Sequence, residues 1–393
     1  MPRPDENATP RPLARFPAEW EKEVVRLGGR TFHGKQVFRW IHARGVTNAS
    51  DMTDLPAGVR TRLIDEGLKS VLDVVRESRA TDNTRKLLVG LEDGANVETV
   101  LIPRVAKRGD LPNPVEEDAD ASAAVEDEDD AETETDESPI AVTQCISTQV
   151  GCAMGCVFCA SGVAGLKRHM RPDEIVAQVL VGRSRLDANE QLRNVVFMGM
   201  GEPLHNYDAT VRTLRLLTHP DGIGLSSRRV TVSTSGLVPE IARLGADFAG
   251  QIGLAISLHA ADDETRTRLM PINKKYPLAE LMTALRAYPL PKRRRITIEY
   301  TLVAGKNDAP SEADKLCRLL RGLPVKVNLI PMNPIEASTL GPPDFSSVLA
   351  FQKVVCDAGY SCFIRRRRGD DVSAACGQLA LLGAKPKVRV NRS

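Results

Sequence analysis

Three cysteines lie within one short stretch of small and apolar residues. The stretch QVGCAMGCVFCASG, residues 149–162, places thiols at Cys152, Cys156 and Cys159. It holds no fourth cysteine or histidine, whereas a structural zinc site takes four ligands. A cubane iron–sulfur cluster has four irons, so three cysteine ligands leave one iron open for a small molecule. The spacing therefore predicts a [4Fe–4S] cluster with an open iron, and three buried core thiols are the alternative.

Short β-rich runs alternate with helical ones from Thr143 onward. The β-rich runs are VTQCIST, NVVFM, RVTVST, IGLAISL, RITIEYTL, VKVNLI and SCFIRR. Such alternation over about 220 residues predicts a parallel sheet, and closure into a barrel fits this length better than a Rossmann pair. No G-x-G-x-x-G follows the first run, so the fingerprint of nicotinamide cofactors is absent. We therefore expect an α/β fold built on a partial (β/α)6 TIM-like barrel.

Glycines and polar residues follow these runs at the points where the predicted strands end. After the cysteine stretch they are GMGEP at 199–203, STSG at 233–236, SLHA at 257–260 and PMNP at 331–334. In a barrel of this kind the chemistry lies at the carboxyl ends of the strands. The sequence therefore predicts a ligand site where these segments meet.

Charge is segregated along the chain. Residues 116–137 carry 13 of the 51 acids and no base, so the rest of the chain holds 53 bases against 38 acids, a net charge of +15. Bases cluster as KRRR at 292–295, RRRR at 365–368 and KPKVRVNRS at the end of the chain. This pattern is the electrostatic footprint of a phosphate-backbone partner such as RNA, and ordinary solvated surface charge is the alternative.

Composition and periodicity divide the chain into regions. Apolar residues at helical spacing predict helices in PAEWEKEVVRLG and TFHGKQVFRWIHARG, and alternating residues predict a hairpin across EDGA. The acidic stretch lacks aromatic residues and cannot bury enough apolar area to offset its ordering entropy. The expected organisation is a disordered N-terminus at 1–12, a helical RNA-binding accessory domain at 13–80, a β-hairpin at 81–102, an acidic disordered insertion at 103–141, the barrel core at 142–384 and a basic tail at 385–393.

Nothing in the sequence points to a membrane or to secretion. No apolar run is long enough to span a bilayer, and the start MPRPDENATPRPLARF is a poor secretory signal. Eight cysteines in a chain of this length argue for reduced thiols in metal binding or catalysis, and against a disulfide scaffold. We therefore expect a cytoplasmic protein without a membrane partner.

The cysteine stretch and the rim segments together resemble a known superfamily. CAMGCVFC matches the signature of the radical S-adenosylmethionine (SAM) enzymes, in which the open iron chelates the amino and carboxylate groups of SAM. GMGEP resembles the SAM-binding glycine–glutamate element of these enzymes, and STSG, SLHA and PMNP resemble their other SAM contacts. The resemblance implies a barrel of the radical SAM type, with SAM bound by Gly201, Glu202, Ser233, Ser257, Leu258, His259 and Asn333. For His259 alone, a structural histidine with satisfied hydrogen bonds is the alternative.

Two further cysteines narrow the resemblance. Cys145 lies in TQCISTQVGC and Cys376 in RRRRGDDVSAACGQLA, and arginines beside Cys376 could hold phosphates near it and favour its thiolate. With VETVLIP at 97–103 and MPINKKYP at 270–277, these segments resemble the RlmN family, adenine-C2 methyltransferases of 23S ribosomal RNA and transfer RNA. The resemblance covers about residues 15 to 384, apart from the acidic insertion.

The resemblance implies a reaction with two molecules of SAM. Cys376 takes a methyl group from the first SAM by displacement, and an electron from the cluster cleaves the second SAM to a 5′-deoxyadenosyl radical. That radical takes hydrogen from the methyl group on Cys376, and the resulting methylene radical adds to C2 of adenine. Glu98, in VETVLIP, accepts the C2 proton; as a residue of a β-hairpin it would more often be a surface carboxylate. Cys145 then attacks the Cys376 sulfur, which releases methylated RNA and leaves a disulfide.

The implied partners follow from this reaction. They are a peptidyl-transferase-centre adenosine of 23S rRNA, the tRNA adenosine next to the anticodon, and a reductase such as a flavodoxin or ferredoxin system; we expect a monomer. Within enzymes, the alternative is methylation at adenine C8. An alternative of another class is a non-catalytic, metal-stabilised RNA-binding protein, which leaves Cys145, Cys376 and the SAM-like segments unexplained.

Overall fold

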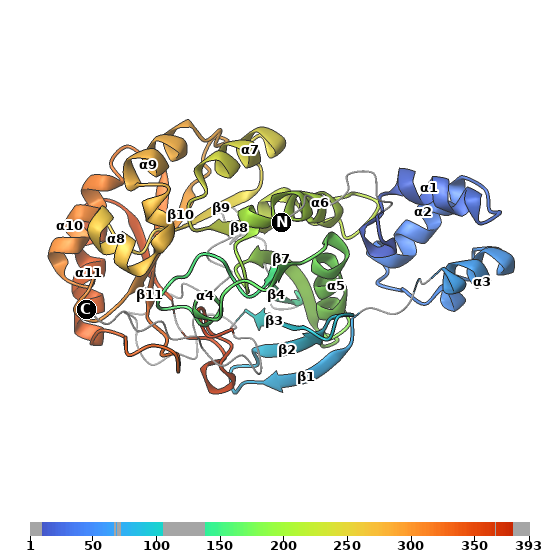
Figure 1. Cartoon of the computed structure of the whole chain (residues 1–393), viewed down its shortest axis with the longest axis horizontal. Helices are drawn as coiled ribbons and strands as arrows, with labels where there is room; N and C mark the ends of the chain where they lie inside the picture. The colour runs from blue at the N-terminus through green and yellow to red at the C-terminus, as the bar shows by residue number, and fades with distance from the viewer. Residues whose placement is uncertain (1–9, 67, 69–71, 105–137, 366, 380–393) are drawn as a thin grey trace.

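The computed structural model describes residues 10–66, 68, 72–104, 138–365 and 367–379. Its helical N-terminal lobe lies at one end of a larger α/β body (Figure 1). Most of the predicted N-terminal segment, nearly all of the acidic insertion and the whole basic tail lie outside the described residues. Their expected disorder therefore stays a prediction.

The N-terminal lobe contains the helices that the periodicity predicted. Its elements are η1 (Pro12–Ala14), α1 (Pro17–Arg26), α2 (Phe32–Phe38), the π-helical turn η2 (Arg39–Ala43), η3 (Ala49–Asp51) and α3 (Ala57–Asp65). Trp20 of α1 and Phe38 of α2 are fully buried in the core. A Cβ at Gly34 would lie 2.4 Å from the backbone nitrogen of Glu21, so glycine allows α2 to approach α1 this closely.

A sheet of ten strands forms the body of the described chain. In spatial order the strands are β1 (Val74–Arg79), β2 (Arg85–Gly90), β3 (Asn96–Pro103), β4 (Ile140–Cys145), β7 (Glu190–Phe197), β8 (Val230–Thr234), β9 (Gly253–Ser257), β10 (Ile296–Leu302), β11 (Val325–Pro331) and β12 (Ser361–Ile364). Neighbours from β4 to β12 are parallel, whereas β1, β2 and β3 form an antiparallel extension on β4. The predicted barrel and the hairpin across EDGA are confirmed. All seven β-rich runs form parallel strands, one more than the six strands of a (β/α)6 barrel.

Two boundaries differ from the expected ones. Strand β1 lies inside the region 13–80 that was predicted to be helical. Its sequence VVRESR carries charged residues and is mostly exposed, so it lacks the apolar alternation that marks a half-buried strand. Pro103 ends β3 and pairs with Val142 of β4, which begins at Ile140. The ends of the predicted insertion 103–141 are therefore strand residues.

Helices alternate with the barrel strands along the chain, and all but the short α4, which lies in the cysteine loop, flank the strands (Figure 1). They are α4 (Ala160–Ala164), α5 (Pro172–Arg183), α6 (Tyr207–Leu217), α7 (Val238–Phe248), α8 (Asp263–Leu269), α9 (Leu278–Ala287), α10 (Pro310–Leu319) and α11 (Phe345–Asp357). Shorter elements are β5 (Gln149–Val150), β6 (Arg168–His169), η6 (Pro203–Asn206), η7 (Ser227–Arg229), η8 (Pro271–Lys274) and η9 (Asp370–Val372). Among the described residues, no helix combines the length and the hydropathy needed to cross a membrane.

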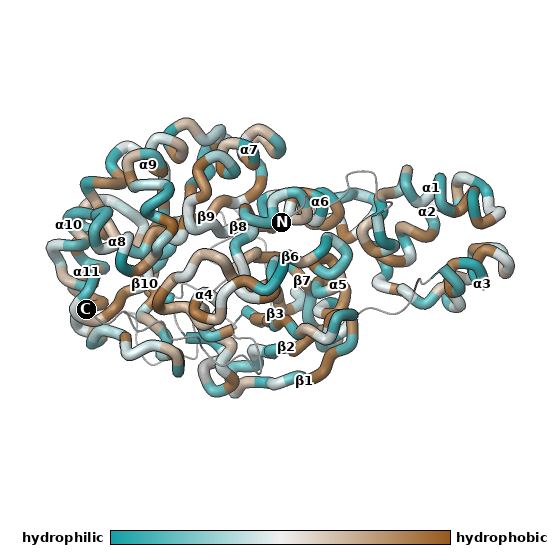
Figure 2. The backbone as a smooth tube through the Cα atoms, viewed as in Figure 1, coloured by the Kyte–Doolittle hydropathy of each residue, from teal (hydrophilic) through white to brown (hydrophobic). Residues whose placement is uncertain are grey.

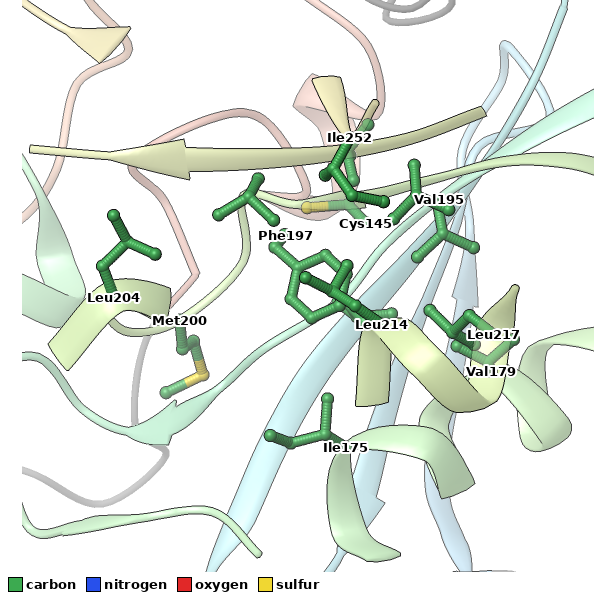
Figure 3. Packing of buried hydrophobic residues seen from close by; sticks show 14 of the residues in the cluster. Cys145, Ile175, Val179, Val195, Phe197, Met200, Leu204, Leu214, Leu217 and Ile252 are labelled. Carbon is green, nitrogen blue, oxygen red and sulfur yellow. The ribbon is translucent and has the colours of Figure 1, made fainter. Parts of the chain in front are cut away.

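The core lies between the strands and these helices. Figure 2 shows apolar residues along β10 and polar residues on α10. Figure 3 shows Phe197 of β7 beside Leu214 of α6, with Ile175 of α5 below them. Burying one such side chain stabilises the fold by about 1.5–3 kcal/mol. This packing fixes the carboxyl ends of the strands, where the candidate site lies.

Candidate active site

A pocket opens where the barrel strands end, with about 930 Å³ of empty space that includes the solvent at its mouth. The predicted site residues that line it are Cys152, Cys156, Cys159, Gly201, Glu202, Ser233, Ser257, His259, Asn333 and Cys376. The other three, Glu98, Cys145 and Leu258, lie outside its lining. Segments more than two hundred residues apart in the chain thus meet at one site, as expected for the rim of a barrel.

The cysteine loop packs closely against its neighbours. Backbone N of Val157 donates to the carbonyl of Leu269 at 3.1 Å, and a Cβ at Gly162 would lie 2.9 Å from the nitrogen of Cys156. Burial raises the pKa of Cys152 to about 12. Burial also raises the pKa of Cys156, and the charges of the two neighbouring thiolates raise it further. Burial raises the pKa of Cys159 as well.

These thiols fit the ligand set of an iron–sulfur cluster. Metal binding replaces thiol protons, so buried cysteines with raised pKa values can become thiolates when iron is bound. The apolar side chains of Met154 and Phe158 line the same pocket and would limit water near a cluster. Within the described part of the chain, no three His, Cys, Asp or Glu side chains meet where they would hold a single metal ion. A cubane binds its thiolates on different irons, so its ligands surround a cluster and need not meet at one atom.

The GMGEP loop is held by Gln149. Glu202 N donates to Gln149 Oε1 at 2.9 Å, and Gly201 has φ +104° with an added Cβ only 2.6 Å from Gln149 Cβ. The Glu202 carboxylate accepts from Ser235 N at 2.8 Å and from Leu204 N at 3.2 Å. Burial raises the pKa of Glu202, and the hydrogen bonds from Ser235 oppose that shift. Gln149 was not predicted as a site residue, since its role depends on a loop about 50 residues away that only the fold brings near.

Arg266 of α8 joins the segments that follow β8 and β9, and it too was not predicted. Its guanidinium is fully buried and donates to Ser235 O at 2.7 Å, to Leu258 O at 3.1 Å and to Asn273 Oδ1 at 2.8 Å. Burial lowers the pKa of Arg266 to about 10. Leu258 itself is buried in the core, so the structure supports a structural place for its side chain. Asn273 lies in MPINKKYP, which was the only sequence signal pointing to this network.

His259 lines the pocket as a neutral imidazole. It has φ +56°, and its Nδ1 accepts from Thr301 N at 2.9 Å, which leaves its proton on Nε2. Burial lowers the pKa of His259 to about 3, and the charge of Arg266 acts in the same direction. Asn307 Nδ2 donates to the carbonyl of His259 at 2.7 Å. The histidine is therefore both a pocket residue and a hydrogen-bonded structural one.

Cys376 is exposed and is fixed beside the cysteine loop through its backbone. Asn333 Nδ2 donates to Cys376 O at 2.9 Å, and Ala160 N donates to Gly377 O at 2.8 Å. Ser161 Oγ donates to Leu379 O at 2.6 Å. The oxygen Oδ1 of Asn333 is buried and has no hydrogen-bond partner among the described residues, so it can accept from a ligand.

Cys145 and Glu98 lie behind the pocket on neighbouring strands. Cys145 ends β4 opposite Val100 of β3 and is 9% exposed. Burial raises the pKa of Cys145 to about 12; the charge of Cys376 adds to this, and the charge of Arg365 opposes it. Both cysteines are free thiols. Glu98 is 3% exposed and contacts Lys86 Nζ through Oε1 at 3.0 Å, so it is no surface carboxylate.

The described arginines of the run before Cys376 differ in their surroundings. Arg365 lines the pocket and lies 3.6 Å from Glu299 Oε2. Arg368 donates to Asp82 Oδ2 and to Pro103 O, each at 2.8 Å. Arg367 is exposed, and residue 366 lies outside the described residues. Arg368 is therefore engaged within the protein, whereas phosphate binding by the other arginines of the run stays a prediction.

Comparison with known proteins gives matches along most of the chain. Residues 146–319 match the radical SAM superfamily, and residues 18–67 match the ribosomal RNA large subunit methyltransferase N-terminal domain. The chain is 70% identical to the dual-specificity RNA methyltransferase RlmN of Sorangium cellulosum, over 96% of this chain and 97% of that one, and 42% identical to RlmN of Syntrophobacter fumaroxidans, over 92% and 95%. A crystal structure of a radical SAM methyltransferase from Sphaerobacter thermophilus matches with a TM-score of 0.80 and 39% identity, over 93% of this chain and 98% of that one. The chain therefore belongs to the RlmN family of radical SAM RNA methyltransferases.

Proposed function

We propose that the protein methylates C2 of adenosine in two RNA classes, 23S rRNA at the peptidyl-transferase centre and tRNA next to the anticodon. One observation carries the proposal: the three-cysteine loop, the SAM-like rim segments and Cys376 meet in a single pocket. The names of the RlmN relatives, which are dual-specificity RNA methyltransferases, support both RNA classes.

The pocket residues divide between two bound groups. Radical SAM enzymes use a [4Fe–4S] cluster and SAM. Cys152, Cys156 and Cys159 would hold the cluster, which supplies the electron that splits SAM. Gly201, Glu202, Ser233, Ser257, Leu258, His259 and Asn333 would bind SAM, with Leu258 acting through its backbone. Glu202 can accept from ribose hydroxyls or an ammonium group, and the neutral His259 can donate from Nε2.

Two cysteines and one carboxylate would act on the RNA. The Cys376 sulfur takes a methyl group from SAM and presents it to C2 of an adenine that has left its stack. Glu98 accepts the C2 proton. Cys145 forms the disulfide with Cys376 that frees the methylated RNA. Each turnover then requires an external reductant, which we propose to be a flavodoxin or ferredoxin system acting on a monomeric, cytoplasmic enzyme.

Nucleoside mass spectrometry tests the regiochemistry and the substrates. rRNA and tRNA from a deletion strain should lack 2-methyladenosine, and complementation with the wild-type chain should restore it in both. Appearance of 8-methyladenosine instead would replace the proposal by its C8 alternative. Absence of any methylated adenosine, together with a colourless protein after anaerobic purification, would favour a non-catalytic RNA-binding protein.

Variants test the two thiols separately. With methyl-labelled SAM, Cys376→Ala should take up no label in the protein. Cys145→Ala should accept the label and then accumulate a covalent RNA–protein adduct on denaturing gels. Free methylated RNA from Cys145→Ala would refute the resolving role of Cys145.

A further inference from the structure

Lys86 of β2 lies between two parts of the proposed site. Its side chain is 10% exposed, and Nζ lies 3.0 Å from Glu98 Oε1 and 3.1 Å from Ser373 O. Ser373 comes three residues before Cys376. One ammonium group therefore contacts both the carboxylate of Glu98 and the loop that carries the exposed thiol.

The strand register explains this arrangement. Lys86 pairs with Val100, Leu88 pairs with Glu98, and Val100 also pairs with Cys145. Directly paired residues lie on the same face of a sheet, and so do residues two apart on one strand. Lys86, Glu98 and Cys145 consequently share the face of the sheet against which the Ser373 segment packs.

A buried lysine at this position is costly for the fold. Lysine is almost never fully buried unless it is paired, and replacing buried ion pairs by apolar residues is often neutral or stabilising. The pair between Lys86 and Glu98 is thus weak grounds for a purely stabilising role. The second contact of Lys86, with the backbone of the Cys376 loop, indicates a role in holding that loop near Glu98.

We propose that Lys86 is a positioning residue of the methyl transfer, holding the Glu98 carboxylate and the Cys376 loop in one fixed arrangement. The inference rests on the proposed function, in which Glu98 takes the C2 proton. In that step the C2–H bond breaks, the proton goes to a carboxylate oxygen of Glu98, and the bonding electron pair stays on the adenine ring. Lys86 keeps its own proton and touches no reacting atom.

The chain offers a matched control for loss of the loop tether alone. Arg368 also links the Cys376 loop to the β1–β2 turn through Asp82 Oδ2 and to the end of β3 through Pro103 O. The loop nitrogen of Gly369 donates to Asp82 Oδ2 at 3.1 Å. Glu98 has no part in these bonds. A variant of Arg368 therefore loosens the loop without removing the cation beside Glu98.

The experiment compares Lys86→Met, Lys86→Arg, Glu98→Gln and Arg368→Met in the reconstituted full-length enzyme. Labelling of Cys376 by the first SAM, kcat, KM for RNA, and the isotope effect with RNA deuterated at adenine C2 are measured. Lys86→Met should accept the label normally, lower kcat roughly 10- to 100-fold with KM little changed, and raise the C2 isotope effect, because proton removal becomes slower. Lys86→Arg should recover most of kcat, and Lys86→Met combined with Glu98→Gln should be no slower than Glu98→Gln alone.

Several outcomes would overturn the proposal. One is a wild-type C2 isotope effect in Lys86→Met, and another is the same isotope effect in Lys86→Met and Arg368→Met. A third is a double variant in which the losses of kcat caused by Lys86→Met and Glu98→Gln add fully. If Lys86→Met fails to take the label on Cys376, the result with Lys86→Arg decides. A normal label with an unchanged C2 isotope effect and unchanged kcat in Lys86→Arg would support the positioning role of Lys86. A lost label in Lys86→Arg would refute that role. Wild-type activity of Glu98→Gln would instead remove the proposed role of Glu98, and label-free turnover by Cys376→Ala would remove the proposed function itself.

Discussion

Replacing Gly201 with alanine tests how firmly the GMGEP loop is held. Gly201 has φ +104°, and an alanine Cβ would lie 2.6 Å from Gln149 Cβ and 2.8 Å from Gln149 N. The backbone conformation alone costs about 1–3 kcal/mol for a residue with a side chain. Gln149 cannot move aside freely, because Oε1 accepts from Glu202 N and Nε2 lies 3.0 Å from His169 Nδ1 and 3.2 Å from His205 Nδ1.

The magnitude follows from these contacts. Displacing Gln149 also loses its hydrogen bond with Glu202 N, which is worth about 1 kcal/mol. The total strain is then about 2–4 kcal/mol. Because the loop can relieve this strain only by moving Glu202 away from its hydrogen bonds, we expect SAM affinity to fall roughly 30- to 700-fold.

Equilibrium binding of SAM to anaerobically reconstituted protein, together with urea unfolding, measures both effects. Gly322→Ala is the control, since Gly322 has φ +79° but no atom within 4 Å of an added Cβ. It should lose stability from its backbone conformation alone and bind SAM normally. SAM binding by Gly201→Ala within about threefold of wild type, or a stability no lower than that of Gly322→Ala, would contradict this expectation.

Three further predictions concern buried polar groups. Burial lowers the pKa of His42 to about 3, and neither ring nitrogen has a hydrogen-bond partner among the described residues. Below about pH 6.5 the imidazole of His42 therefore binds a proton in the unfolded chain but stays neutral in the folded chain. Stability should therefore fall as pH drops from about 6.5 toward 3, and His42→Phe should flatten this fall in urea unfolding at pH 7 and 5; an unchanged slope would contradict it. Arg266→Met should lower the free energy of unfolding by about 2–4 kcal/mol and weaken SAM binding, whereas Arg268→Met, an exposed change on the same helix, should do neither. Cys152→Ala should lose the visible absorbance and inorganic sulfide of anaerobically purified protein while Cys317→Ala keeps both, and a brown Cys152→Ala would count against the ligand set.

Local patterns were sufficient to predict the barrel and most of the pocket. The cysteine loop, GMGEP, STSG, SLHA and PMNP are short runs directly after strands, and parallel strands bring their carboxyl ends together whatever the loops between them do. Their meeting around one pocket follows from the strand order. The roles of the individual residues stay predictions, because chemistry with SAM and RNA depends on contacts that the protein alone does not make.

Buried polar partners could not be predicted in the same way. Three such residues bind groups in other segments of the chain, so no local spacing predicts their roles: Gln149, Arg266 and Lys86. The run of four arginines could not be interpreted from the sequence either, because identical residues do not show which side chains bind within the protein. Arg368 turns to Asp82, nearly 300 residues earlier, and is unavailable as a free surface cation.

The antiparallel extension of the sheet has a consequence for self-association. Without β1, β2 and β3, the strand that carries Cys145 would be an open edge, able to pair with another chain. The actual outer edge is β1, where Arg76, Glu77 and Arg79 are exposed. Charged side chains on an edge strand discourage intermolecular sheet growth. The antiparallel extension thus covers the edge of β4 and leaves a charged strand, β1, at the edge of the sheet in its place.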